Sequence, residues 1–176
     1  RFAQENGLRV IRDKAKNVVI YKPGTKGYEK ADPIILQGHL DMVCQKKDDA
    51  TIDFTNDGIE AYTDGDFIKA KGTTLGADDG IAVSMIMAVL ASRDLPHPPI
   101  EAVFTTDEEI GMIGAKELDC TVLKGKRMIN LDSEEADILT VSCAGGSDFK
   151  LFLPIEKTVV HGTKLSLEIN DLKGGH

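Results

Sequence analysis

The chain has 176 residues, of which 41% are hydrophobic and 28% charged, a balance typical of a globular protein with a sizeable core. Its formal net charge of −8 argues against a nucleic-acid groove and suits a protein that binds cations. No apolar run is long enough to span a bilayer, and the start shows no signal-peptide pattern, so we expect no membrane partner. The three cysteines, Cys44, Cys120 and Cys143, are odd in number and widely spaced. They indicate free thiols in a reducing compartment, and we expect a cytoplasmic protein.

The first part of the chain predicts two hairpins with a buried strand between them. Residues 7–12 and 17–22 are two apolar-rich segments separated by a polar turn, which is typical of a hairpin. Residues 33–38 include a short apolar, β-branched run that predicts a buried strand. Residues 58–62 and 67–71 alternate in polarity around a short turn and predict a second, half-exposed hairpin.

Helices and strands alternate in the middle of the chain. Residues 81–92 are almost all apolar and predict a helix packed in a sheet crossover, and residues 111–118 predict a shorter helix or turn. Strands are expected at 100–106, at 127–131 and again at 138–142. This order implies an α/β fold with a mixed, mainly parallel sheet and crossover helices.

The pattern changes near Gly145. Residues 148–153 and 163–169 alternate like antiparallel strands with no helix between them. We therefore expect a metal-binding catalytic domain over 1–144 and the beginning of an α+β domain over 145–176. The chain starts without methionine and stops within a glycine-containing motif, so we also expect that both domains are incomplete.

Polar side chains follow three of the predicted strands where each strand ends. His39 follows the first, and Glu108 and Glu109 follow the second. Asp132 follows the third, and Asp78 begins the intervening helix. Because ligands bind beyond the carboxyl ends of strands in open parallel sheets, we expect these groups on one rim. Their mutual repulsion favours one or two divalent cations, and nitrogen and oxygen ligands suit zinc, manganese or cobalt.

Each acidic group also has a simpler explanation by itself. Asp78 and Asp79 could cap a helix, residues 107–109 could be a chance acidic run, and residues 132–135 could be a solvated turn. Their joint placement at one end of one sheet favours the metal site. Asp41, two residues beyond the histidine, is placed to accept a hydrogen bond from the second ring nitrogen.

Taken together, these motifs resemble the M20 metallopeptidases, and most closely the aminoacyl-histidine dipeptidase branch. The resemblance rests on five stretches of the chain, at residues 38–41, 76–80, 106–111, 130–135 and 172–176. It implies a zinc-peptidase-like catalytic domain followed by a lid domain, through which the full-length protein would form a homodimer.

The resemblance also implies a site for two divalent metal ions, zinc being expected and cobalt or manganese being alternatives. His39 and Asp132 would bind the first ion, Glu109 the second, and Asp78 would bridge the two. The remaining ligand of the family, a histidine near the C-terminus, has no counterpart in this chain, so the second site is expected to be incomplete.

The catalytic roles implied by the resemblance fall on three further residues. Glu108 would be the general base, Asp41 would orient the histidine ligand, and His176 would stabilise the developing oxyanion. The implied activity is metal-dependent hydrolysis of small peptides of the Xaa-His type and of dipeptides more broadly, with this chain by itself inactive.

Two alternatives stay open. The chain could belong to an amidohydrolase or deacetylase that acts on N-acyl amino acids. It could also be a non-catalytic acidic module that binds Ca²⁺ or Mg²⁺. Those ions prefer all-oxygen coordination, so His39 argues against the second alternative.

Overall fold

The computed structural model contains two compact units, Arg1–Asp137 and Ile138–His176. It describes residues 1–170 with the exception of 134, 136, 144, 147, 148, 160 and 169. The domain boundary expected at residue 145 stays a prediction. No helix among the described residues is long and apolar enough to cross a membrane.

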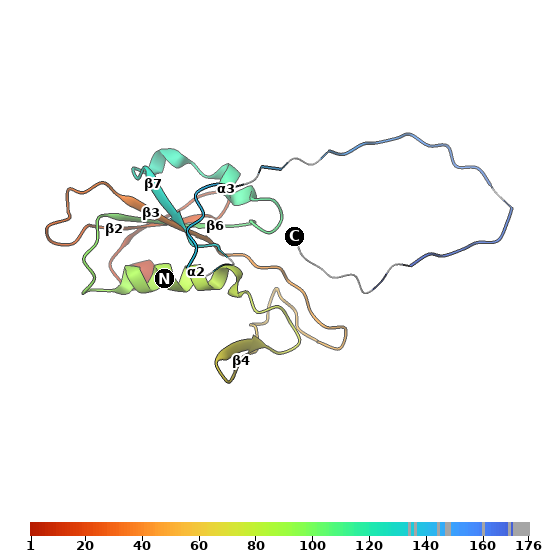
Figure 1. Ribbon diagram of the computed structural model, residues 1–176, viewed down its shortest axis with the longest axis horizontal. Helices are drawn as coiled ribbons and strands as arrows, with labels where there is room; N and C mark the ends of the chain where they lie inside the picture. Colours follow the sequence, from red (N-terminus) through yellow and green to blue (C-terminus); the bar gives the residue numbers. More distant parts are fainter. Residues whose placement is uncertain are drawn as a thin grey trace. The chain divides into compact units, whose positions relative to one another are not determined.

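The elements of the first unit follow the order that the sequence predicts (Figure 1). Both predicted hairpins, the predicted strands of this unit and its two predicted helices are present, with bounds that differ by a few residues. The second hairpin is exposed almost throughout rather than half exposed, the last strand is exposed at all four positions, and the short helices at residues 2–5 and 120–122 were not predicted. The elements are α1 (Phe2–Glu5), β1 (Arg9–Arg12), β2 (Val18–Lys22), β3 (Ile34–His39), β4 (Ala61–Asp64), β5 (Phe67–Ala70), α2 (Ala77–Ala91), β6 (Ile100–Thr105), α3 (Ile113–Glu117), the 3₁₀ helix η1 (Cys120–Val122) and β7 (Arg127–Asn130).

Five of the strands form one mixed sheet in the order β1-β2-β6-β3-β7, and β4 pairs with β5 separately. The strands β6, β3 and β7 run parallel to one another. On the β6 side, β2 pairs with β6 and β1 pairs with β2, and both pairings are antiparallel. The predicted α/β class with a mixed sheet is therefore confirmed. The parallel half of the sheet is the half that carries the candidate site.

Helices cover both faces of the sheet, with α2 on one side and α3 on the other (Figure 1). On the α2 side, Ile86 and Phe104 belong to one buried cluster, and on the other side Val19, Ile35 and Val103 form a second. Strand β6 is buried at every position because it lies inside the sheet and is covered on both faces. This explains why its sequence is nearly continuous in apolar residues.

Helix α2 buries a narrower stripe than its sequence suggests. Ala82, Ile86 and Leu90, spaced four residues apart, are buried, whereas Ile81 and Met85 are about half exposed. The helix also begins irregularly, because its second and third residues depart from helical backbone angles. These two residues are the aspartates of the candidate site.

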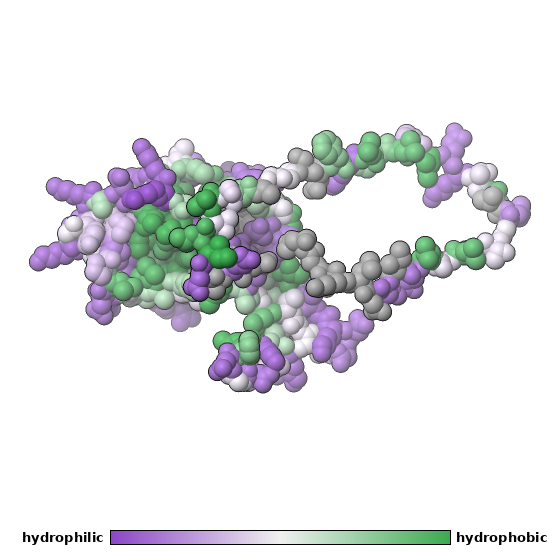
Figure 2. Space-filling model, viewed as in Figure 1, coloured by the Kyte–Doolittle hydropathy of each residue, from purple (hydrophilic) through white to green (hydrophobic). Residues whose placement is uncertain are grey.

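In the second unit, the described residues between 138 and 170 form no helix or strand. The strands predicted at 138–142, 148–153 and 163–169 are therefore wrong for their described residues. Alternation of apolar and polar residues indicates which side chains could share one face of a strand. A strand also needs a partner strand for its backbone hydrogen bonds. Without that pairing, side chains such as Leu151 and Leu153 lie largely exposed. Figure 2 shows hydrophobic residues along this part of the chain that no other residues cover.

Candidate metal centre

The candidate site lies where the three parallel strands end. His39, the last residue of β3, pairs with Thr105, the last residue of β6. On the other side of β3, Gln37 pairs with Asn130, the last residue of β7, and Asp132 follows two residues later. The parallel register therefore brings the residues after all three strands to one edge, as the sequence predicts.

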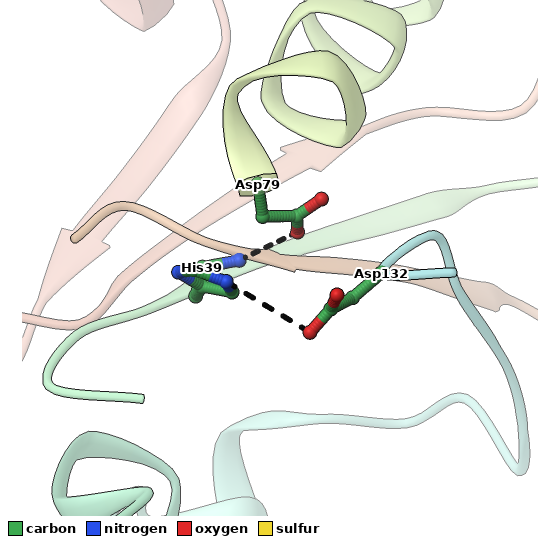
Figure 3. A group of neighbouring side chains, drawn as sticks. All are labelled: His39, Asp79 and Asp132. Carbon is green, nitrogen blue, oxygen red and sulfur yellow. Dashed lines mark hydrogen bonds and ion pairs between the residues drawn. The ribbon is translucent and has the colours of Figure 1, made fainter. Parts of the chain in front are cut away.

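His39 is the centre of this edge, with a side chain that is only 1% exposed. Its Nε2 lies 3.0 Å from Asp78 Oδ1 and 3.8 Å from Asp132 Oδ2. Its backbone N–H donates to Asp79 Oδ2 at 3.0 Å. Figure 3 shows His39 connected by dashed lines to both the Asp79 and the Asp132 carboxylates. One buried nitrogen thus faces several carboxylate oxygens.

Asp41 holds both the imidazole and the neighbouring loop. The second ring nitrogen, His39 Nδ1, lies 2.8 Å from the Asp41 carbonyl, whereas the Asp41 carboxylate is 3.5 Å away. The closer partner is therefore the backbone of Asp41, and not the side chain that the sequence suggests. The carboxylate instead accepts hydrogen bonds from the backbone N–H groups of Glu108 and Glu109, at 3.1 and 3.2 Å. Asp41 in this way connects the ends of β3 and β6.

The two adjacent aspartates at the start of α2 diverge. Asp79 is buried and turned toward the β3 backbone, where a Cβ on Gly38 would approach its Oδ2 to 2.5 Å. Only glycine fits at that position without a shift. Asp78 remains 65% exposed and presents Oδ1 to the His39 ring. The geometry therefore separates a carboxylate buried against the strand from one available to a ligand.

The donor atoms are close enough to share cations. Single donor atoms of His39, Asp79 and Asp132 lie within 4.8 Å of one another, and so do those of His39, Glu108 and Glu109. A nitrogen and several carboxylate oxygens without a thiolate fit zinc, cobalt or manganese. The nearby thiol of Cys44 is exposed and directed to the Met42 carbonyl instead. The residues present thus fit a divalent metal centre.

The pKa shifts of the site residues also favour bound cations. Burial raises the pKa of Glu108, and the Asp132 carboxylate adds to this while His39 opposes it. Burial likewise raises the pKa of the Asp79 carboxyl. Burial lowers the pKa of His39, but its hydrogen bond with Asp78 and the other nearby acids outweigh that effect and raise it. Bound cations would relieve this crowding of negative charge.

A pocket of about 480 Å³ opens beside Glu108 and Asp132. It runs between the sheet and the α3–η1 segment, and most of its lining is apolar. Its floor carries a polar row across three strands, in which Asn130 Nδ2 donates to Gln37 Oε1 and Gln37 Nε2 donates to Thr105 Oγ1. Sequence reasoning did not identify this row, although all three residues lie near the ends of predicted strands.

The expected site residues from the first unit are therefore found together: His39, Asp41, Asp78, Glu108, Glu109 and Asp132. The seventh, His176, lies outside the described residues. Asp79 joins the set as an additional oxygen donor near His39, a proximity that its sequence position beside Asp78 signals only weakly.

Two known proteins match most of the chain. The cytosol non-specific dipeptidase of Escherichia coli is 45% identical over 99% of this chain. The crystal structure of aminoacylhistidine dipeptidase from Vibrio alginolyticus matches 76% of the chain at 50% identity, with a TM-score of 0.73. The chain is a homologue of these two dipeptidases. No family model matches it.

A more distant M20 neighbour shares the same fold. The aminopeptidase PepT of Bacillus cereus matches 76% of the chain at 29% identity, with a TM-score of 0.60. The chain spans about a third of the relatives it matches, covering 36% of the E. coli dipeptidase and 27% of the Vibrio chain. The fold of the chain is that of the M20 peptidase domains, and this similarity implies dependence on divalent metal ions.

Proposed function

We propose that this chain forms the metal-binding part of a dipeptidase that hydrolyses Xaa-His dipeptides and other short peptides. The observation that carries the proposal is the meeting of the His39 imidazole with Asp78 and Asp132 next to two further carboxylates. The names of two matching proteins, a non-specific dipeptidase and an aminoacylhistidine dipeptidase, support this substrate class.

The proposed site holds two divalent ions, with zinc as the expected metal and cobalt or manganese as alternatives. His39 and Asp132 would hold the first ion and Glu109 the second. Asp78 would bridge them, because it is the aspartate of its pair that is exposed and in contact with the imidazole. Asp79, which is buried and accepts the His39 backbone N–H, would support the strand end.

The bound ions would polarise the peptide carbonyl and make a water molecule more acidic. Glu108 would accept the proton of that water and pass it to the leaving amine. Its raised pKa suits the first step, because a carboxylate whose pKa lies nearer to neutrality is a stronger base. Asp41 would hold Glu108 in place through the backbone of the loop.

Three parts of the proposal concern the full-length protein. His176, which the structure does not describe, would stabilise the oxyanion of the tetrahedral intermediate. A lid domain beginning near residue 145 would form a homodimer. The protein would act in the cytosol, as the name of the E. coli relative suggests for that enzyme.

The test is a substrate panel on the full-length protein loaded with zinc. Release of free histidine from Xaa-His dipeptides, together with slower cleavage of other dipeptides, is the expected result. Preferential hydrolysis of N-acetyl amino acids would instead indicate a deacetylase. Metal binding without hydrolysis of either class would indicate a non-catalytic module and would contradict the proposal.

A further inference from the structure

The loop that carries Glu108 and Glu109 has an irregular backbone. It runs from the end of β6 to the start of α3, over residues 106–114. Asp107 and Met112 both have a φ of 55°, which non-glycine residues seldom adopt. At its base the loop is closed by two backbone bonds, in which the N–H groups of Ile113 and Gly114 donate to the carbonyls of Asp107 and Thr106, both at 3.0 Å.

The side chain of Asn17, in the turn before β2, is bonded to both sides of that base. Its Oδ1 accepts the backbone N–H of Thr106 at 3.1 Å, and its Nδ2 donates to the Gly114 carbonyl at 2.8 Å. The second hydrogen of Nδ2 is directed to Asp13 Oδ2 at 2.7 Å. Asn17 is 1% exposed, and its bond to Gly114 is buried while the other two are partly buried.

The residue types at this junction leave little room for substitution. An amide supplies both the acceptor for Thr106 and the donors for Gly114 and Asp13, and neither an aspartate nor an alanine does so. A Cβ on Gly114 would lie 2.3 Å from the Thr106 carbonyl oxygen and 2.5 Å from Asn17 Oδ1. A second bond, from Thr106 Oγ1 to the Ala15 carbonyl at 2.7 Å, fixes the same turn to the loop.

We infer that Asn17 is a positioning residue for Glu108 and Glu109, an inference that rests on the proposed function. Asn17 fixes the base of their loop, and the Asp41 carboxylate fixes the backbone of the two glutamates themselves. The amide of Asn17 is bonded to the loop base and to Asp13, so its effect on the glutamates is exerted through the backbone. Loosening the base displaces the general base and a metal ligand together.

The test uses Asn17→Asp and Asn17→Ala in the full-length protein. Because a displacement of about 1 Å at a reacting group can cost 100-fold in rate, we expect kcat to fall by about 10- to 100-fold. KM should change by less than about threefold, because substrate contacts remain. The visible spectrum of the cobalt-substituted protein should also change, because it reports the geometry of the ligand supplied by Glu109.

The matched control is Lys22→Met on the neighbouring strand. Lys22 donates to the carbonyls of Val89 and Ser92 at the far end of α2, so its loss also removes two bonds to backbone. The control should lower the thermal unfolding midpoint while leaving kcat and the cobalt spectrum unchanged. Folded Asn17 variants with wild-type kcat and an unchanged cobalt spectrum would overturn the inference.

If neither Asn17 variant folds, Asp13→Ala carries the test. Asp13 is only partly buried and holds the Asn17 amide without touching the loop base. The same changes at smaller size are then expected, and an unchanged kcat and spectrum would count against a positioning role. A wild-type protein that binds cobalt but cleaves no dipeptide would contradict the proposed function and not the inferred support of the loop, which the cobalt spectra test separately.

Discussion

The five-stranded sheet has two regions that are stabilised by different forces, the apolar core on its faces and the charged rim at the ends of β3, β6 and β7. The core buries Ile86, Phe104 and Val103 and is stabilised by removing apolar surface from water. The rim gathers one histidine and several carboxylates, whose mutual repulsion disfavours the metal-free charged state. Stability and chemistry should therefore be separable by mutation.

The largest effect is expected at the rim, on turnover. Glu108→Gln removes the proposed base, a change that typically costs about 100- to 10,000-fold in rate. It should not lower stability, because the carboxylate it removes is partly desolvated and lies near other acids. Steady-state hydrolysis and thermal unfolding of the full-length protein measure the two effects.

Glu117→Gln is the matched control, since Glu117 is an exposed acid on α3. It should leave both turnover and unfolding as in the wild type. Normal turnover in Glu108→Gln would remove Glu108 from the role of general base.

The core should respond in the opposite way. Ile86→Ala deletes a side chain that is fully buried beneath α2, and substitutions of this kind cost about 2–5 kcal/mol of folding free energy. Chemical denaturation should show this loss, while kcat per folded molecule stays close to that of the wild type. Ile81→Ala, on the half-exposed side of the same helix in this structure, should cost less. Equal losses at the two positions would argue against the described packing of α2.

A smaller effect is expected from pH on metal affinity. The pKa of His39 is raised in the metal-free site, so the folded protein holds this proton to a higher pH than a free histidine does. A metal ion must displace that proton, and below the raised pKa its affinity should weaken by up to about tenfold per pH unit. Above the raised pKa this dependence should disappear.

Competition with a coloured chelator between about pH 5.5 and 8 measures this dependence. His97→Gln is the control, because His97 lies in the loop before β6 and contacts the Pro98 carbonyl instead of the rim. A metal affinity that stayed constant over this pH range would be inconsistent with His39 as a ligand.

Much of the first unit could be predicted from sequence because its signals are local. Alternation and apolar runs identified the strands, and the parallel register then placed His39 and Asp132 together. The roles within each pair of adjacent acidic residues were harder to predict, because sequence spacing does not show which of two adjacent carboxylates faces a ligand. The structure separates Asp78 from Asp79 through the irregular start of α2.

Contacts between distant segments could not be predicted. Asn17 resembles an ordinary turn residue in sequence, and its bond to Gly114 spans 97 positions. The bonds from Asp41 to the Glu108 and Glu109 backbone are equally non-local. In the second unit, the alternation of apolar and polar residues predicted strands that are absent from the described residues. Their side chains suit strands, but their backbones have no strand pairing.

The most direct test of the account is the metal content of the full-length protein and of its Asp78→Ala variant, measured by elemental analysis after loading with zinc and dialysis. The account predicts about two zinc ions per wild-type chain and the loss of both in the variant, because the proposed Asp78 carboxylate would bridge them. Asp64→Ala, which removes an exposed acid paired with Lys69, should keep both ions. A wild-type protein without bound zinc, or an Asp78→Ala variant that keeps one full equivalent, would contradict a bridged two-metal site on this rim.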